Sequence, residues 1–338
     1  MKKIRVSLVV FNYNGKIHLR EYFTSVFKQT KVPDEIILFD NGSSDESVAY
    51  VAKRFPKVKI FQNSFNAGTA LGSNIAFSHT SGDYVIFQSN DIVLDSHCIK
   101  SLINTINDDP TIGICTSVAL YIDRDTKKKT HKIENAGGYQ DIFGFSWPAQ
   151  NGKKLKSIPS VKEVFLSYGS SFIIRRHLFE TVGGFDDAFF TLNDDVDLSW
   201  RVRLQKYRIV YTKRSFLYHK GHATLGPLFP RWVKRYWSER NCMRTLLKNY
   251  GLSSLIFILP GYFSLLTAEM AYYCLRGRFD LFWAVLKAVA WNMRYFPDTM
   301  SKRAIVQKKR KVNDVYISQL LSKTSFKLLY FNNFKQSI

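Results

Sequence analysis

The feature that most constrains the fold of this chain is a regular alternation of apolar, β-branched segments with amphipathic helical patterns near its N-terminus. We expect strands at residues 6–11, 35–39, 58–61 and 84–88, where short apolar runs are bounded by turn-forming residues. We expect helices at residues 17–29, 45–55 and 68–80, the second of them capped by Ser43 and Ser44. Strands that alternate with helices predict an α/β fold, in which a parallel sheet carries helices on both faces.

Polar residues follow each of these strands at the point where the strand is expected to end. Residues 12–15 follow the first strand, and residues 40–45 follow the second. Residues 63–68 follow the third strand, and residues 89–91 follow the fourth. Because the carboxyl ends of parallel strands meet at one edge of a sheet, ligands bind beyond that edge. The four polar segments therefore predict a pocket of nucleotide size.

A dense group of carboxylates lies further along the chain. Asp194, Asp195 and Asp197 place three carboxylates within four positions. Carboxylates this close repel one another, and a metal ion, a proton or a sugar hydroxyl would relieve that repulsion. A solvated helix N-terminus, where Asp is favoured, is the alternative interpretation. Asp197 and Arg201 are one helical turn apart and are expected to form an ion pair.

The net charge of +22 is concentrated in the C-terminal part of the chain. Residues 201–338 contain 26 Lys and Arg against 5 Asp and Glu, whereas residues 1–200 contain 23 against 22. A cationic segment of this kind is typical of proteins that bind nucleic acid, anionic lipid or a phosphorylated substrate. We expect a globular domain at residues 1–228, with halves at about 1–95 and 96–228, and a basic helical region at residues 229–338.

Apolar stretches interrupt this basic region. Residues 231–241 predict a basic, aromatic helix, whereas residues 249–268 carry no charge but are broken by a Pro-Gly pair. Residues 279–296 form a second apolar stretch that contains two basic residues. A helix that spans a membrane needs about 20 apolar residues, and the Pro-Gly break and the basic flanks favour helices that lie in the membrane interface. A true span, or two buried helices of a small helical subdomain, are the alternatives.

The partner and the compartment follow from the same composition. No nucleic-acid motif appears and apolar stretches separate the basic residues, so we expect an anionic membrane surface, and no nucleic acid, as a partner. The four cysteines lack a Cys-x-x-Cys spacing, which predicts reduced, buried thiols in a cytosolic protein. The apolar run at residues 6–11 is too short for the hydrophobic core of a secretory signal. We therefore expect the protein at the cytoplasmic face of the cell membrane, as a peripheral or monotopic protein.

Seven segments, in this order, resemble the inverting glycosyltransferases of family 2. Their GT-A fold implies a mixed, mostly parallel α/β sheet with helices on both faces, here followed by a C-terminal helical region that associates with the membrane. They are residues 9–15, 34–47, 66–74, 82–91, 183–186 and 194–198, followed by His219. The resemblance covers about two thirds of the chain, from residue 6 to about residue 241. The tail, with Arg240, Asn241 and the segment 302–307, is similar to the branch that includes many bacterial rhamnosyltransferases.

The resemblance implies transfer of a sugar, with inversion, from a nucleotide diphosphate to an acceptor hydroxyl. Asp195 matches the catalytic base of the family, and Asp194 stands where the family usually has Glu. Asp91 matches the last carboxylate of the Asp-x-Asp metal motif, whose first carboxylate is missing here. His219 matches the histidine that can complete the shell of a Mg²⁺ or Mn²⁺ ion, with His222 as the competing choice.

The resemblance also implies how the donor and the acceptor bind. The nucleotide sugar is expected to contact Phe11, Tyr13, Asp40, Asn66, Gly68, Ser89 and Asn90. The acceptor is expected to contact Gly184 and Asp194. The first half of the globular domain would then bind the donor, and its second half the acceptor. As an alternative, Asp40 and Asp91 are ordinary turn-forming residues.

The implied donor is dTDP-rhamnose or a UDP-sugar, and the implied acceptor is a hydroxyl of a lipid-linked or growing cell-surface polysaccharide. Because Ser89 replaces a carboxylate of the metal motif, two alternatives on the same fold stay open. One is a catalytically inactive protein that binds a sugar nucleotide, and the other is a nucleotidyltransferase.

Overall fold

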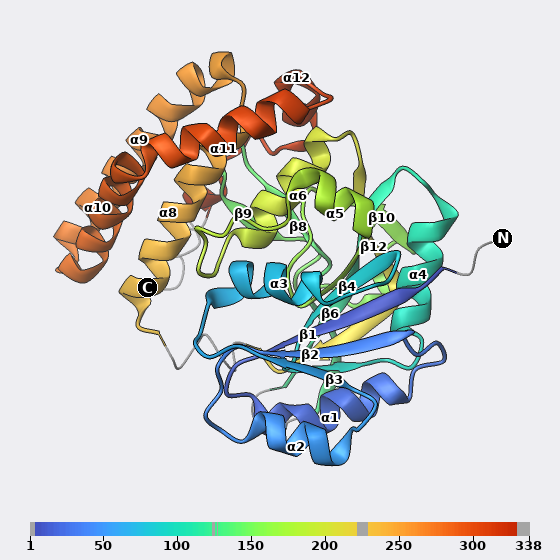
Figure 1. Ribbon diagram of the computed structural model, residues 1–338. Coiled ribbons are helices and arrows are strands. Elements are labelled where there is room, and N and C mark those ends of the chain that lie inside the picture. Colours follow the sequence, from blue (N-terminus) through green and yellow to red (C-terminus); the bar gives the residue numbers. More distant parts are fainter. Residues whose placement is uncertain (1–3, 124–125, 127, 222–228, 330–338) are drawn as a thin grey trace.

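The structure, a computed structural model, describes residues 4–123, 126, 128–221 and 229–329 (Figure 1). Within those residues the centre of the molecule is a ten-stranded mixed sheet with helices on both faces. The first strands of the sheet are β1 (Val6–Asn12), β2 (Glu35–Asp40), β3 (Lys59–Gln62), β4 (Tyr84–Ser89) and β5 (Ile92–Leu94). The later strands are β6 (Ile112–Ile122), β7 (Lys129–Asn135), β10 (Val161–Glu163), β11 (Ser171–Arg175) and β12 (Arg208–His219).

The strand order brings the polar ends of three strands to one edge. The order is β10-β12-β6-β11-β4-β1-β2-β3, with β5 paired to β12 and β7 paired to β6. The ladders that join β1 to β2 and β4, β2 to β3, and β12 to β6 are parallel, and β11 is antiparallel to β4 and β6. The register places Asn12 beside Asp40 and Phe11 beside Ser89. The carboxyl ends of β1, β2 and β4 therefore meet, as the sequence predicts.

Two hydrophobic cores lie on opposite faces of the sheet, because alternate residues of a strand point to opposite sides. In β1, Leu8 and Val10 belong to one core and Val9 belongs to the other. The first core is covered by α1 (Lys16–Phe27), α2 (Ser47–Arg54) and α4 (Cys98–Asp108). The second core is covered by α3 (Gly68–Ser78), α5 (Arg176–Val182) and α6 (Asp194–Leu204).

The seven elements that the sequence predicts in the N-terminal half are all present, with bounds within two residues of the prediction. The predicted cap of α2 is wrong. Glu46 precedes the helix in a left-handed conformation, and no side-chain hydrogen bond caps α2 within the described part of the chain. The Ser43 hydroxyl donates to the Asp40 carboxylate instead, so it holds the loop after β2.

A small hairpin and a group of helices complete the fold. The hairpin consists of β8 (Gly138–Gln140) and β9 (Ser146–Pro148), and the 3-10 helix η1 (Leu155–Ser157) follows it. The C-terminal helices are α8 (Arg231–Asn249), α9 (Leu252–Leu275), α10 (Phe279–Arg294), α11 (Phe296–Lys309) and α12 (Asp314–Leu320). They gather beside α6, where a third core contains Trp200 of α6 and Leu246 of α8 (Figure 1).

The helices predicted at residues 231–241 and 279–296 are present as α8 and α10, and the uncharged stretch at residues 249–268 lies within the helix α9 and its N-terminal flank. Within the described residues, α9 alone is long and apolar enough to cross a membrane, and its buried residues are Leu255, Tyr262, Leu266 and Glu269. Ile256 and Phe257 of α9 are 65% and 79% exposed. The predicted domain boundary after residue 228 adjoins residues that the structure does not describe, and it stays a prediction.

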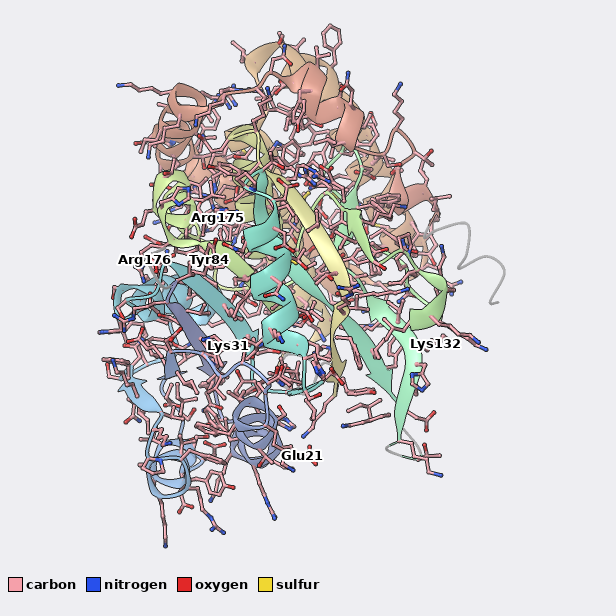
Figure 2. The ribbon with its side chains drawn as sticks, turned by 90° about the vertical axis from the view of Figure 1, so that its right-hand side faces the viewer. Glu21, Lys31, Tyr84, Lys132, Arg175 and Arg176 are labelled. Atoms are coloured by element: carbon pink, nitrogen blue, oxygen red, sulfur yellow. The ribbon has the colours of Figure 1, made fainter. Side chains whose placement is uncertain are left out.

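A cationic side chain, Arg175, lies at the amino end of β4. Figure 2 shows Arg175, at the end of β11, beside Tyr84 at the start of β4. The Arg175 Nη1 atom donates to the Tyr84 hydroxyl at 3.0 Å, and its Nη2 atom donates to the Ile106 carbonyl of α4. These bonds join the amino end of β4 to α4, at the opposite end of the strand from the polar loops.

Three of the four cysteines are buried as predicted, namely Cys98, Cys115 and Cys242. Cys274 is exposed near the end of α9, so the prediction of a buried thiol is wrong there.

Candidate active site

A cavity of about 650 Å³ lies beyond the carboxyl ends of β1 and β4. Its walls come from segments between Val9 and Phe229, including the loop that leads into α6. The predicted site residues that line it are Phe11, Tyr13, Asn66, Gly68, Ser89, Asn90, Asp91, Asp194, Asp195 and His219. The structure thus brings together residues that are more than 200 positions apart in the chain.

A chain of hydrogen bonds fixes the four polar segments that follow β1, β2, β3 and β4 relative to one another. The Asn90 amide donates to the Asn12 side-chain oxygen at 2.5 Å, and the Asn12 amide donates to Asp40 at 2.7 Å. Beside Asp40, the Asn41 amide donates to the side-chain oxygen of Asn66, which follows β3, at 2.7 Å. Buried side chains that satisfy one another in this way form a rigid rim.

Two predicted contacts lie outside the cavity lining of the described chain, those of Asp40 and Gly184. Asp40 is fully buried, and its carboxylate accepts hydrogen bonds from Asn12 and from the backbone and hydroxyl of Ser43. Its contact with a nucleotide base stays a prediction, and its role in this structure is to hold the rim. Gly184 has a φ of +65°, and its carbonyl accepts a hydrogen bond from Arg201. It therefore forms a turn in the segment that precedes Asp194 and Asp195.

The three clustered carboxylates divide into two groups. Asp194 and Asp195 begin α6 and face the cavity, whereas Asp197 points away into the protein. The Thr69 hydroxyl donates to Asp194 at 2.7 Å. The backbone N–H of Gly169 donates to Asp195 Oδ2 at 3.0 Å, and the Val196 N–H donates to Oδ1. Asp195 therefore has a fixed position at the cavity wall.

Asp195 is chemically suited to accept a proton near neutral pH. Burial raises its pKa, and the neighbouring charge of Asp194 raises it further, to about 7. The hydrogen bonds from Gly169 and Val196 lower the pKa but do not outweigh these effects. Burial also raises the pKa of Asp194. A pair of carboxyls this close titrates as a unit, and such shifted groups in a cavity are typical of catalytic sites.

A second polar group lies across the cavity, where His219 stands between two carboxylates. The His219 Nε2 atom is 3.4 Å from Asp91 Oδ2, and its Nδ1 atom is 2.7 Å from Glu134 Oε2. Burial alone would lower the pKa of His219, but the hydrogen bonds to Asp91 and Glu134 raise it to about 10. Burial would raise the pKa of Asp91, but the bond to His219 and its charge lower it to about 2. The alternative histidine, His222, lies outside the described residues.

Asp91 and His219 fit a divalent cation, which on binding would displace the proton that His219 Nε2 otherwise carries, because only a neutral imidazole coordinates a metal. The Oδ1 atom of Asp91 is buried at the cavity, yet it makes no hydrogen bond to any residue that the structure describes. A buried carboxylate oxygen without a partner is costly, and a cation would satisfy it. Glu134 would orient the imidazole, as carboxylates beyond the first shell of a metal commonly do. No cluster of three or more ligating side chains occurs among the described residues, so the remaining ligands would be phosphate oxygens or water.

Asp197 forms the predicted pair with Arg201 and has further partners on α8. Its carboxylate accepts from the Arg201 Nε at 2.9 Å, from Lys248 at 2.9 Å and from the Asn249 amide at 3.0 Å. Lys248 also donates to Asp186 at 2.5 Å. Burial would raise the pKa of Asp197, but the charges of Arg201 and Lys248 lower it. The third carboxylate is thus neutralised inside the protein and leaves the other two at the cavity.

Sequence reasoning missed several residues at this site. Glu134 comes from β7, a strand that contains Lys129, His131 and Lys132 and no recognisable motif. Tyr168 lines the cavity from the loop before β11. These residues converge only through the sheet, so local sequence gives no signal for them.

Comparison with known proteins identifies the family. The fold is a mixed, mostly parallel α/β sheet of GT-A type followed by a C-terminal helical region. The family model described as "Glycosyl transferase family 2" matches residues 7–183, slightly more than half of the chain, so the chain belongs to glycosyltransferase family 2.

In the aligned segments, about a quarter of the residues are identical between this chain and its relatives. N-acetylglucosaminyl-diphospho-decaprenol L-rhamnosyltransferase of Mycobacterium tuberculosis is 27% identical over 237 residues, which cover 64% of this chain and 76% of the relative. The O-antigen chain rhamnosyltransferase RfbN of Salmonella typhimurium is 25% identical over 237 residues, covering 68% and 70%. A solved mannosyltransferase of Pyrobaculum calidifontis, in complex with GDP-Man and Mn2+, has a TM-score of 0.52 at 16% identity, covering 91% of this chain and 86% of that one. At that identity the likeness shows the fold alone.

Proposed function

We propose that this glycosyltransferase moves a sugar, with inversion, from a nucleotide-diphosphate sugar to a hydroxyl of a lipid-linked or growing cell-surface polysaccharide. The observation that carries the proposal is the presence, in one cavity, of Asp195 with a pKa near neutrality and of the Asp91–His219 pair. The mycobacterial and Salmonella relatives are named rhamnosyltransferases, which supports rhamnose as the transferred sugar. We take dTDP-rhamnose as the first candidate donor and a UDP-sugar as the second.

Asp195 is the general base of this proposal. An acceptor hydroxyl is a poor nucleophile until a base takes its proton, and a base with a pKa near the working pH does so best. The hydrogen bonds from Gly169 and Val196 fix the carboxylate, and Asp194 is positioned to accept a hydrogen bond from the same acceptor sugar. Asp194 is itself held by Thr69, which comes from the donor side of the cavity.

The donor would lie between the polar rim and the Asp91–His219 pair. Phe11 and Tyr13 present aromatic side chains to the cavity for the nucleotide base, and Gly68 allows close backbone approach to the ribose or diphosphate. Asp91 and His219 would hold Mg²⁺ or Mn²⁺, which when bound neutralises charge on the leaving diphosphate. Ser89 stands where the family's first carboxylate would be, and it leaves Asp91 as the carboxylate ligand.

We further propose that the C-terminal helices attach the enzyme to an anionic membrane surface on the cytoplasmic side. Ile256 and Phe257 of α9 and Trp283 of α10 are between 57% and 79% exposed. Arg276 and Arg278 lie between α9 and α10 in the sequence, and Lys287 and Arg294 lie on α10 itself. Exposed apolar residues with cationic neighbours are typical of helices in the membrane interface. Co-sedimentation with phosphatidylglycerol vesicles, lost when both Ile256 and Phe257 are replaced by Ser, would support this attachment.

The decisive experiment for the function follows the nucleotide product. Purified enzyme is incubated with dTDP-rhamnose or a UDP-sugar, with and without a short-chain N-acetylglucosaminyl diphospho-lipid as acceptor. The proposal predicts release of the nucleoside diphosphate only when acceptor is present, and an inverted anomeric configuration in the product. Donor binding without release would favour the inactive sugar-nucleotide binder, and release of pyrophosphate from a nucleoside triphosphate and a sugar phosphate would favour the nucleotidyltransferase.

A further inference from the structure

Three aromatic rings from distant parts of the chain form a cluster at the cavity. Phe190 and Trp237 have ring centroids 5.0 Å apart, and Phe229 and Trp237 have centroids 4.8 Å apart. Phe190 and Phe229 contact each other edge to face at 6.3 Å. Phe190 and Phe229 line the cavity, and Trp237 of α8 packs against both.

This cluster lies next to Asp194 and Asp195. The Phe190 carbonyl accepts a hydrogen bond from the Thr69 N–H at 2.6 Å, and the Thr69 hydroxyl donates to Asp194. Gly68 can approach this carbonyl only because it lacks a Cβ atom, which would lie 2.1 Å from the Phe190 oxygen. The backbone that carries Phe190 is therefore fixed between the donor side and the base.

Core packing does not account for these rings. The neighbouring Phe185 and Phe189 are buried in or beside the second core, whereas Phe190, Phe229 and Trp237 are partly exposed. None of the three belongs to the hydrophobic clusters of the described residues. Partly exposed aromatic faces beside polar groups in a cavity are typical of ligand sites.

We propose that Phe190 and Phe229 form an acceptor subsite, on which the apolar face of a pyranose ring stacks while its hydroxyl meets Asp195. This inference rests on the proposed function and names the class of ligand that the acceptor side holds. The C–H groups of a sugar face carry partial positive charge and are attracted to the negative face of an aromatic ring. The group beside the base must be the ring that carries the reacting hydroxyl, so a sugar fits this position and a polyprenyl chain does not. Trp237 is a positioning residue, because it supports both rings from behind.

The test uses the whole chain. Nitrophenyl pyranosides and the short-chain N-acetylglucosaminyl diphospho-lipid are first screened with the wild type, and the variants are then measured with an acceptor that the wild type uses. Phe190→Leu and Phe229→Leu remove a ring while keeping apolar volume, and each should raise the acceptor KM about tenfold. The donor Kd, measured by calorimetry, should stay unchanged. Phe190→Tyr keeps the ring and should restore the acceptor KM. Phe296→Leu, an exposed aromatic on α11 away from the cavity, serves as the matched control.

Three results separate the possibilities. Leucine variants whose acceptor KM matches that of the wild type overturn the subsite. Variants that lose use of the lipid acceptor but keep use of lipid-free pyranosides show that the rings bind the lipid chain, which also overturns it. A wild type that binds no nucleotide sugar and transfers to no acceptor contradicts the proposed function itself, and is recognised before any variant is made.

Discussion

The side-chain amide of Asn241 on α8 donates to the backbone carbonyls of Leu192 and Thr191, at 2.7 and 2.9 Å. Leu192 and the following Asn193 have φ values of +67° and +60°, which non-glycine residues rarely adopt. Such conformations cost about 1–3 kcal/mol each and persist only where neighbouring groups hold them. A helix expected from sequence to attach the protein to a membrane therefore holds the turn that leads into Asp194 and Asp195.

Replacing Asn241 by Ala should loosen this turn and misplace the carboxylates. We expect kcat to fall about 10- to 100-fold, because a small displacement of a catalytic group costs that much, while the donor Kd stays unchanged. Steady-state kinetics and calorimetry measure the two quantities. Thr245→Ala is the control, since this buried hydroxyl on the same helix makes no hydrogen bond to the residues described. Equal losses in both variants would mean that α8 acts only through general stability.

The pH dependence of the reaction follows from the raised pKa of Asp195. A protonated carboxyl cannot accept the acceptor proton, and the pKa lies at about 7 instead of the ordinary 3.8. On the acidic limb of the pH profile, kcat/KM should therefore rise between pH 6 and pH 8, and it should level off above pH 8. Because Asp194 and Asp195 titrate as a pair, the inflection belongs to both. A profile that is flat down to pH 5 would contradict a base with this pKa.

The ammonium of Lys248 is the most critical buried charge for stability. It bridges Asp186 and Asp197, and all three side chains are no more than 2% exposed. Lys248→Met leaves two buried carboxylates with fewer partners, which should cost about 3 kcal/mol of unfolding free energy. Denaturant unfolding measures the loss. Lys16→Met, which removes the exposed pair with Glu46, should leave the midpoint unchanged.

Metal binding should depend on Asp91 and, through His219, on Glu134. With a bound nucleoside diphosphate, Asp91→Asn should abolish the increase in melting temperature that Mn²⁺ produces. Glu134→Gln should weaken Mn²⁺ affinity about 10- to 100-fold, as loss of a carboxylate that orients a histidine ligand does. Calorimetric titration of Mn²⁺ gives both results without an activity assay. Glu180→Gln on the exposed face of α5 is the control, and an equal loss there would argue against the site.

The donor side was predictable from sequence because its determinants are local. The apolar runs that form β1 to β4 each precede a polar loop, and parallel pairing alone brings those loops to one edge. Asp40 shows the limit of this reasoning. The sequence places it at the edge, but whether its carboxylate faces the cavity depends on Asn12 and Ser43, which occupy it.

The rest of the site was less predictable because its contacts join residues far apart in sequence. Glu134 meets His219 across 85 positions, and Asn241 meets Leu192 across 49. Neither Glu134 nor Asn241 lies in a pattern that indicates its partner. The charge of the C-terminal region predicted binding to phosphate or to a membrane. Lys248 and Arg244 of α8 instead form buried ion pairs with Asp186.

The central claim is that Asp195 is the base of a sugar transfer, and one substitution tests it most directly. Asp195→Asn keeps the shape of the side chain and removes its ability to take a proton. The account predicts that this variant binds the nucleotide-sugar donor with an unchanged Kd, while transfer to the acceptor falls at least about 100-fold, the usual contribution of a general base. Transfer by the Asn variant at the wild-type rate, with the donor bound equally well, would contradict the account.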